Sequence, residues 1–137
     1  MNYSKKKILI SFTESCVTKK LFVRLDDFSY LCSLKKRTMY DVKITAVRKA
    51  DYKDLQQLYE NPIEHSCDVC EGQTWISHAG TKPEGMCDSA WESMQSFVEA
   101  LARGEGNFFD GWMKNPFSAM ISCNDGFRPV SFLLERE

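Results

Sequence analysis

Apolar residues occupy every second position of the segment 40–46, with polar residues between them. This period of two is typical of a β-strand with one buried face. Residues 73–78 alternate in the same way between flanking glycines and predict a second strand. Residues 118–123 and 128–135 predict a hairpin, because the turn-forming segment 124–127, Asn-Asp-Gly-Phe, separates them.

Two other segments have the period of an α-helix. A short helix is predicted over residues 52–60, with Asp51 as its N-cap. A longer helix is predicted over residues 89–103, because a capping-box pattern begins at Ser89 and Gly104 suits a left-handed C-terminal cap. The apolar positions of the longer helix, which we expect to face a sheet, are Trp91, Met94, Phe97, Val98 and Leu101.

The predicted order of elements is β-α-β-α-β-β. This order is typical of an α+β domain, here a small, largely antiparallel sheet with two helices on one face. The domain spans residues 39–137, and before it only the segments 8–12 and 21–25 resemble strands. We interpret residues 1–38 either as a basic N-terminal extension or as an artefact of an upstream start codon.

Charge is distributed unevenly along the chain. The net charge of −1 combines +6 over residues 1–38 with −7 over residues 39–137. An acidic domain disfavours binding to nucleic acid, which is bound chiefly through clustered Lys and Arg. Apolar runs are far shorter than the roughly 20 residues of a membrane span, and no signal peptide is recognisable. We therefore expect a cytoplasmic protein with no nucleic-acid or membrane partner.

Several short motifs occur in order within residues 39–137. They are Lys82-Pro83-Glu84-Gly85-Met86-Cys87, Ala90-Trp91, Ala100-Leu101-Ala102-Arg103-Gly104, Gly111-Trp112-Met113 and Cys123-Asn124-Asp125-Gly126-Phe127-Arg128-Pro129-Val130. Together they resemble a family of uncharacterised proteins of roughly one hundred residues, the size of one small domain, found largely in anaerobic bacteria and archaea. The resemblance places Cys67, Cys87 and Cys123 on recurring cysteine positions, whereas the spacing around Cys70 departs from the family. It implies a fold and no particular activity.

Four of the six cysteines are candidate metal ligands. Cys67 and Cys70 have the C-x-x-C spacing that lets two thiolates bind one metal, zinc or iron, from a tight turn. Cys87 at the start of the longer helix and Cys123 at the end of the third strand can reach the same rim of the sheet as Cys67. The candidates to complete the ligand set are Cys87, Cys123, His65 and His78.

Two other roles for these thiols stay open. Cys87 lies just before the longer helix, where the helix dipole favours a thiolate and therefore a redox role. Asp68 opposes a redox role for the C-x-x-C pair, because it places a negative charge between the two thiols. The remaining alternative is that the cysteines are inert, partly buried thiols.

Residues 106–117 are unusually aromatic for a loop. Such a loop covers the core, packs on a partner or lines a ligand pocket, since loops normally carry polar residues over the surface. We therefore expect either a homodimer, through this loop or a sheet edge, or a pocket for a small molecule of unknown identity. The candidate ligand-binding residues are Trp112, Arg103, Arg128 and Asp125.

Common catalytic signatures do not occur in the sequence. It contains no G-x-G-x-x-G, P-loop, H-E-x-x-H or G-x-S-x-G motif, and its two histidines leave little material for acid–base catalysis. An ordinary hydrolase or nucleotide enzyme is therefore disfavoured. The sequence predicts a small binding or accessory protein with a cysteine metal site. The alternative is a small enzyme that uses a reactive cysteine or a metal-bound water.

Overall fold

The computed structural model describes residues 9–10, 21–22 and 39–137. The chain divides into two units, Met1–Arg37 and Thr38–Glu137. In the first unit, β1 (Leu9–Ile10) pairs with β2 (Leu21–Phe22) in an antiparallel ladder. The rest of the two strand-like stretches predicted there lies outside the described residues.

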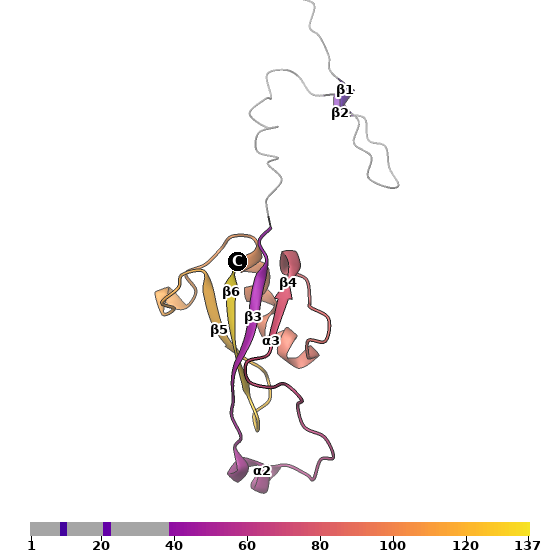
Figure 1. The fold of residues 1–137 in the computed structure, drawn as a ribbon, viewed down its shortest axis with the longest axis vertical. Coiled ribbons are helices and arrows are strands. Elements are labelled where there is room, and N and C mark those ends of the chain that lie inside the picture. Colours follow the sequence, from indigo (N-terminus) through magenta and orange to yellow (C-terminus); the bar gives the residue numbers. More distant parts are fainter. Residues whose placement is uncertain (1–8, 11–20, 23–38) are drawn as a thin grey trace, which may run out of the picture. The chain divides into compact units, whose positions relative to one another are not determined.

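The second unit has the predicted α+β fold and the predicted order of elements. Its four strands form one sheet in the order β4-β3-β6-β5, and every neighbouring pair is antiparallel (Figure 1). The elements are β3 (Val42–Lys49), α2 (Lys53–Tyr59), β4 (Thr74–Ser77), the 3₁₀ turn η2 (His78–Gly80), α3 (Asp88–Ala102), the 3₁₀ turn η3 (Phe109–Gly111), β5 (Ser118–Ser122) and β6 (Val130–Arg136).

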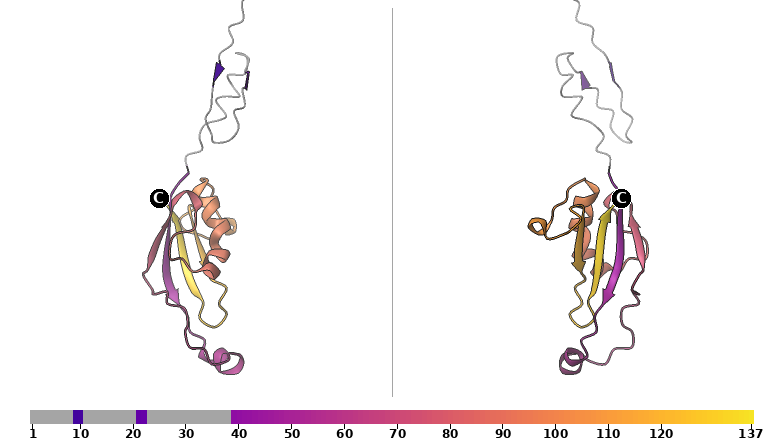
Figure 2. Two further views of the ribbon diagram at one scale, coloured as in Figure 1. Left: turned by 90° about the vertical axis from the view of Figure 1, so that its right-hand side faces the viewer. Right: turned by 60° about the vertical axis from the view of Figure 1, so that its left-hand side comes forward.

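The two helices occupy different places. Helix α3 lies against one face of the sheet, whereas α2 lies beyond the end of β3 (Figures 1 and 2). Helix α2 has no buried residue, and Leu58 is 69% exposed. The expected placement of both helices on one face therefore holds for α3 alone. The link of residues 50–52 instead continues beside the β5–β6 hairpin, because the Ala50 and Tyr52 N–H groups donate to the carbonyls of Pro129 and Phe127, both at 2.9 Å. Tyr52, not Asp51, is the N-cap of α2.

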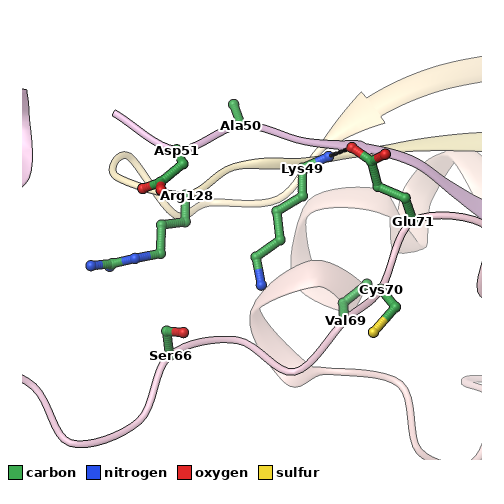
Figure 3. A pocket seen from close by; sticks show the side chains of 8 residues that line it. All are labelled: Lys49, Ala50, Asp51, Ser66, Val69, Cys70, Glu71 and Arg128. Carbon is green, nitrogen blue, oxygen red and sulfur yellow. Dashed lines mark hydrogen bonds between the residues drawn. The ribbon is translucent and has the colours of Figure 1, made fainter. Parts of the chain in front are cut away.

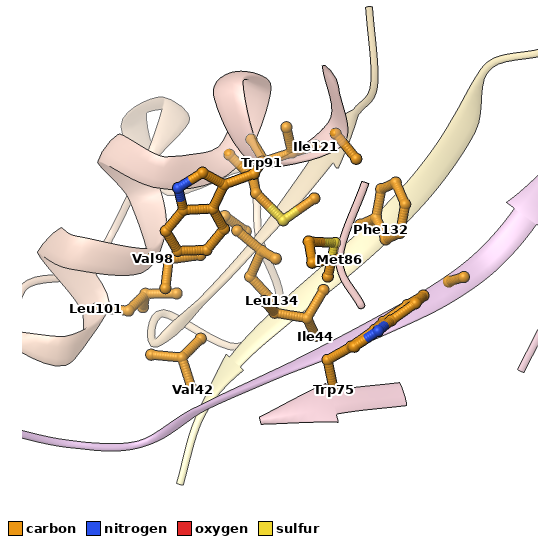
Figure 4. Packing of buried hydrophobic residues seen from close by; sticks show 14 of the residues in the cluster. Val42, Ile44, Trp75, Met86, Trp91, Val98, Leu101, Ile121, Phe132 and Leu134 are labelled. Carbon is orange, nitrogen blue, oxygen red and sulfur yellow. The ribbon is translucent and has the colours of Figure 1, made fainter. Parts of the chain in front are cut away.

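The core lies between α3 and the covered face of the sheet (Figure 4). Ile44 of β3 pairs with Leu134 of β6 and with Trp75 of β4, so alternate positions of three strands point to the helix. Trp75 and Phe132 also meet with ring centroids 6.1 Å apart. The fully buried members from α3 are Met94, Val98, Leu101 and Ala102.

The sequence predicted the C-terminal cap of α3 correctly but not its N-terminal cap. Cys87 is the N-cap, and no side chain hydrogen-bonds to the free backbone N–H groups, so the capping box predicted at Ser89 does not form. At the other end Gly104 adopts φ +87°, as predicted. The Gly104 and Glu105 N–H groups donate to the carbonyls of Leu101 and Ala100, both at 2.9 Å, which is a Schellman cap.

The opposite face of the sheet carries the polar and partly exposed positions of the strands. Ile76 and Met120 on this face are 36% and 43% exposed. The homodimer expected from the sequence stays a prediction. No helix in the described part of the chain is long and apolar enough to cross a membrane.

The packing of α3 can be tested with two Leu to Ala substitutions in helices. Leu101 is 0% exposed and Leu58 is 69% exposed. We expect Leu101→Ala to lower the free energy of unfolding by about 2–5 kcal/mol, because it leaves a cavity in the core. Leu58→Ala should change it by less than about 0.5 kcal/mol. Urea denaturation of both variants measures the difference, and equal losses would contradict the position of α3 in the core.

The boundary at Met39 can be tested by shortening the chain. A protein that consists of residues 39–137 contains every strand and helix of the second unit. We expect it to unfold in one cooperative transition with a midpoint close to that of the full chain. Thermal and urea unfolding of both proteins provide the comparison. A non-cooperative transition in the shortened protein would show that residues 1–38 complete the domain.

Candidate functional site

Cys67, Cys87 and Cys123 line one cavity of about 110 Å³. Cys67 comes from the loop between α2 and β4, Cys87 is the N-cap of α3, and Cys123 directly follows β5. All three are free thiols; Cys87 is exposed and the other two are partly buried. The fold therefore brings together three of the four cysteines predicted as metal ligands.

The walls of this cavity are mainly apolar. Val69, Ala90, Val130 and Phe132 line it beside the three thiols. Its two further polar side chains are Ser89 and Asp125, so the described lining includes no histidine, lysine or arginine. The site consequently combines soft sulfur donors and one carboxylate, without a cation of its own.

Hydrogen bonds to β3 hold the loop that carries Cys67. The Lys49 ammonium donates to the backbone carbonyl of Cys67, and the Lys49 N–H donates to the Glu71 carboxylate at 2.8 Å. The Gly72 N–H donates to the carbonyl of Ala46 at 2.7 Å. These bonds fix the backbone of the loop and leave the Cys67 side chain on the cavity wall.

The other two cysteines are held by their own backbone bonds. The Cys87 carbonyl accepts the first hydrogen bond of α3, from the Trp91 N–H at 2.9 Å. Cys123 and Val130 close the start of the β5–β6 hairpin, with the Cys123 N–H donating to the Val130 carbonyl at 3.0 Å. In return the Val130 N–H donates to the Cys123 sulfur at 3.2 Å. These two bonds fix the position of Cys123 at the start of the hairpin.

Cys70 lies apart from the other three. It is exposed and lines a separate surface groove of about 510 Å³ (Figure 3). Its thiol contacts the Asp68 carbonyl at 3.6 Å. Val69 lines both the groove and the cavity, so the loop itself forms a wall between them. The two members of the C-x-x-C pair thus line different spaces.

The two histidines are also outside the cavity. His78 follows Ser77, which pairs with Val42 at the start of β3, and its Nδ1 contacts the Asp41 carboxylate at 2.9 Å. The cysteine cavity lies at the other end of β3, where Lys49 pairs with Val130. His65 is an exposed loop residue and does not line the cavity.

The candidate ligand-binding residues do not meet at one site. Asp125 lines the cysteine cavity, and its Oδ1 accepts the backbone N–H groups of residues 127 and 128. Arg128 lines the groove on the other side of the loop. Arg103 is at the opposite end of α3 and pairs with Glu105 at 2.8 Å. Trp112 is 83% exposed in the aromatic loop.

The aromatic loop packs on the middle of α3. The ring centroid of Phe97 lies 5.3 Å from that of Phe108 and 5.5 Å from that of Phe109. Phe97 is therefore covered by the loop and only partly buried, whereas we expected it in the core with Trp91. Trp112 extends this cluster by stacking on Phe109 at 6.3 Å and remains mostly open to solvent.

An ion pair joins the C-terminal end of α2 to the β5–β6 hairpin. The Arg128 guanidinium binds Glu60 with two parallel bonds of 2.7 Å, and both side chains are about 15% exposed. This bidentate hydrogen bond lowers the pKa of Glu60 below its ordinary value of 4.5. It also occupies Arg128, so the groove does not present a free guanidinium to a ligand.

The sequence pattern did not identify Lys49 or Glu60 as residues that build the site. Each acts through a partner more than fifteen positions away, and no local motif signals such a contact.

Comparison of the chain with protein-family models, with curated proteins and with solved structures found no match.

The Glu60–Arg128 pair makes stability depend on pH in acid. Because the pKa of Glu60 is lowered by folding, the pair stabilises the protein above pH 4.5 and the stabilisation is lost as the pH falls through the folded-state pKa. We expect Glu60→Gln to be less stable than the unchanged protein at pH 7 and to approach it below pH 4.5. The control is Glu64→Gln, at an exposed position, which should not change the dependence of stability on pH in this way. Urea denaturation from pH 3 to 7 measures both, and a pH-independent difference would contradict the role of the pair.

Proposed function

We propose that residues 39–137 form a small binding protein that holds a metal-containing ligand among Cys67, Cys87 and Cys123. The observation that carries this proposal is their convergence on one cavity, although they come from three separate segments of the chain. Zinc and iron are the expected metals, because both accept thiolate ligands.

The charges around the cavity favour a cationic ligand. Three thiols and Asp125 line it, and the described lining contributes no positive side chain. Deprotonation of the thiols would leave several negative charges in a partly apolar space, which is unfavourable unless a cation neutralises them. A metal centre supplies that charge, whereas an anionic organic ligand would add to the repulsion.

The resemblance noted in the sequence supports the same three residues. Its recurring cysteine positions are Cys67, Cys87 and Cys123, and the spacing departs from the family around Cys70. The structure separates these cysteines in the same way, since Cys70 lines the groove and the other three line the cavity. Membership of that family is part of this proposal.

Catalysis by Cys87 is the alternative function. Its thiol is exposed at the N-terminus of α3, where a substrate can reach it. However, a nucleophilic cysteine is usually activated by a neighbouring histidine or cation, and the described cavity lining provides neither. The arrangement of the three thiols therefore supports metal binding better than nucleophilic catalysis.

Metal analysis of single cysteine variants tests the proposal. We expect the full chain, purified without oxygen and incubated with zinc, with ferrous iron, or with ferrous iron and sulfide, to retain metal after gel filtration under at least one of these conditions. Cys67→Ser, Cys87→Ser and Cys123→Ser should each lose most of it, because every ligand contributes to affinity.

Cys70→Ser is the matched control, since Cys70 belongs to the same loop as Cys67 but lines the groove. We expect this variant to retain as much metal as the unchanged chain. Absence of bound metal from the unchanged chain, or an equal loss in Cys70→Ser, would contradict the proposal.

A further inference from the structure

The thiol cavity is larger than a single ion requires. Its volume is about 110 Å³, whereas one water molecule needs about 10–15 Å³ measured in the same way. A single zinc or iron ion is no larger than a water molecule and would leave most of this space empty. The cavity is therefore suited to a group of several atoms.

The described residues do not form a site for a single ion. A tetrahedral zinc with bonds of about 2.3 Å holds its sulfurs within roughly 4 Å of one another. Among the residues that the structure describes, no three His, Cys, Asp or Glu side chains are grouped closely enough to hold one ion. Cys67, Cys87 and Cys123 instead surround a common space.

We infer that this cavity binds an iron–sulfur cluster, with Cys67, Cys87 and Cys123 each ligating a different iron. The inference rests on the proposed function and specifies its ligand. In a four-iron cluster each thiolate would bond to its own iron, with sulfide ions between the irons, so the cysteines stand farther apart than around one ion. Three thiolates leave one iron for a different ligand, and Asp125 lines the same cavity.

Backbone groups at the site offset the negative charge that thiolate ligands bring to a cluster. The Val130 N–H donates to the Cys123 sulfur at 3.2 Å, and such bonds to sulfur are among the factors that set the reduction potential of a cluster. Cys87 is the N-cap of α3, a helix of 15 residues, whose N-terminal N–H groups have no side-chain cap. The positive end of this helix dipole therefore faces the cavity and offsets negative charge.

The apolar part of the wall shields one side of such a cluster from water, whereas Cys87 is exposed. Val69, Ala90, Val130 and Phe132 form most of the lining besides the thiols. Limited contact with solvent lowers the rate at which water displaces the ligands of a cluster, and burial also contributes to its reduction potential.

Anaerobic reconstitution tests this inference. The full chain is incubated with ferrous iron and sulfide under reducing conditions and then desalted. Iron and acid-labile sulfide are measured per chain, together with the visible absorption spectrum and the electron paramagnetic resonance spectrum of the reduced sample. We expect iron and sulfide in nearly equal amounts, a broad visible absorption and a paramagnetic signal on reduction.

Single variants show which thiols hold the cluster. We expect Cys87→Ser and Cys123→Ser to retain less than about one tenth of the sulfide of the unchanged chain, since a cluster rarely survives the loss of one of three thiolates. Cys70→Ser should retain all of it. The double variant Cys16→Ser/Cys32→Ser should also retain it, because the three proposed ligands are within residues 39–137.

Each other outcome has a distinct meaning. Bound iron or zinc without sulfide, lost in Cys87→Ser, would overturn the cluster and leave the proposed metal-binding function intact. No bound metal, either after incubation with metal alone or after incubation with ferrous iron and sulfide, would overturn both the cluster and the proposed metal-binding function. Loss of the cluster in Cys70→Ser or in the double variant would overturn the assignment of its ligands to Cys67, Cys87 and Cys123.

Discussion

The packing of α3 on one face of the sheet is the interaction on which the rest of the domain depends. Met94, Val98 and Leu101 are fully buried there. The C-terminal end of the helix is tied to the start of β3, because the Tyr40 N–H donates to the Ala102 carbonyl at 2.8 Å. Since a helix is stiff, fixing its stripe and one end also fixes the other end. That other end carries Cys87, which is thereby placed beside the β5–β6 hairpin.

Sequence periodicity predicted the strands and α3 because each has one buried face. Pairing of Ile44 with Leu134 and Trp75 shows that the alternating positions are the ones that face the helix. The same reasoning misplaced α2, since the pattern of a two-turn helix does not specify what it packs against. The capping box predicted at Ser89 was also wrong, because a capping box is a local signal, although the helix begins only one residue earlier, at Asp88. Buried Met86, whose N–H donates to the Pro83 carbonyl at 3.3 Å, precedes the helix in a turn and starts it at Asp88.

Chain topology allowed the convergence of Cys87 and Cys123 to be predicted, since they lie at the ends of α3 and β5, whereas Cys67 reaches the same cavity from the middle of the α2–β4 loop. Their separation from Cys70 was not predictable from the C-x-x-C spacing. That spacing is compatible with a tight turn around a metal, but here the loop runs between two spaces and presents its side chains to both. The sequence also contained no sign of the contact between Lys49 and the Cys67 carbonyl. This contact joins distant segments through a backbone atom, which every residue has.

The hydrogen bonds around the cavity determine which parts of the site can move when a ligand binds. Lys49 and the Gly72–Ala46 bond restrain the backbone of the loop, and the Cys123–Val130 bonds restrain the hairpin. The backbone at both places is therefore ordered without a ligand, so binding does not have to supply the entropy cost of ordering it. Restraint of Cys67 acts on its carbonyl and not on its sulfur, so rotation about its side-chain bond can still adjust the thiol. A rigid backbone with an adjustable sulfur would let the cavity match the bond lengths of the proposed metal centre.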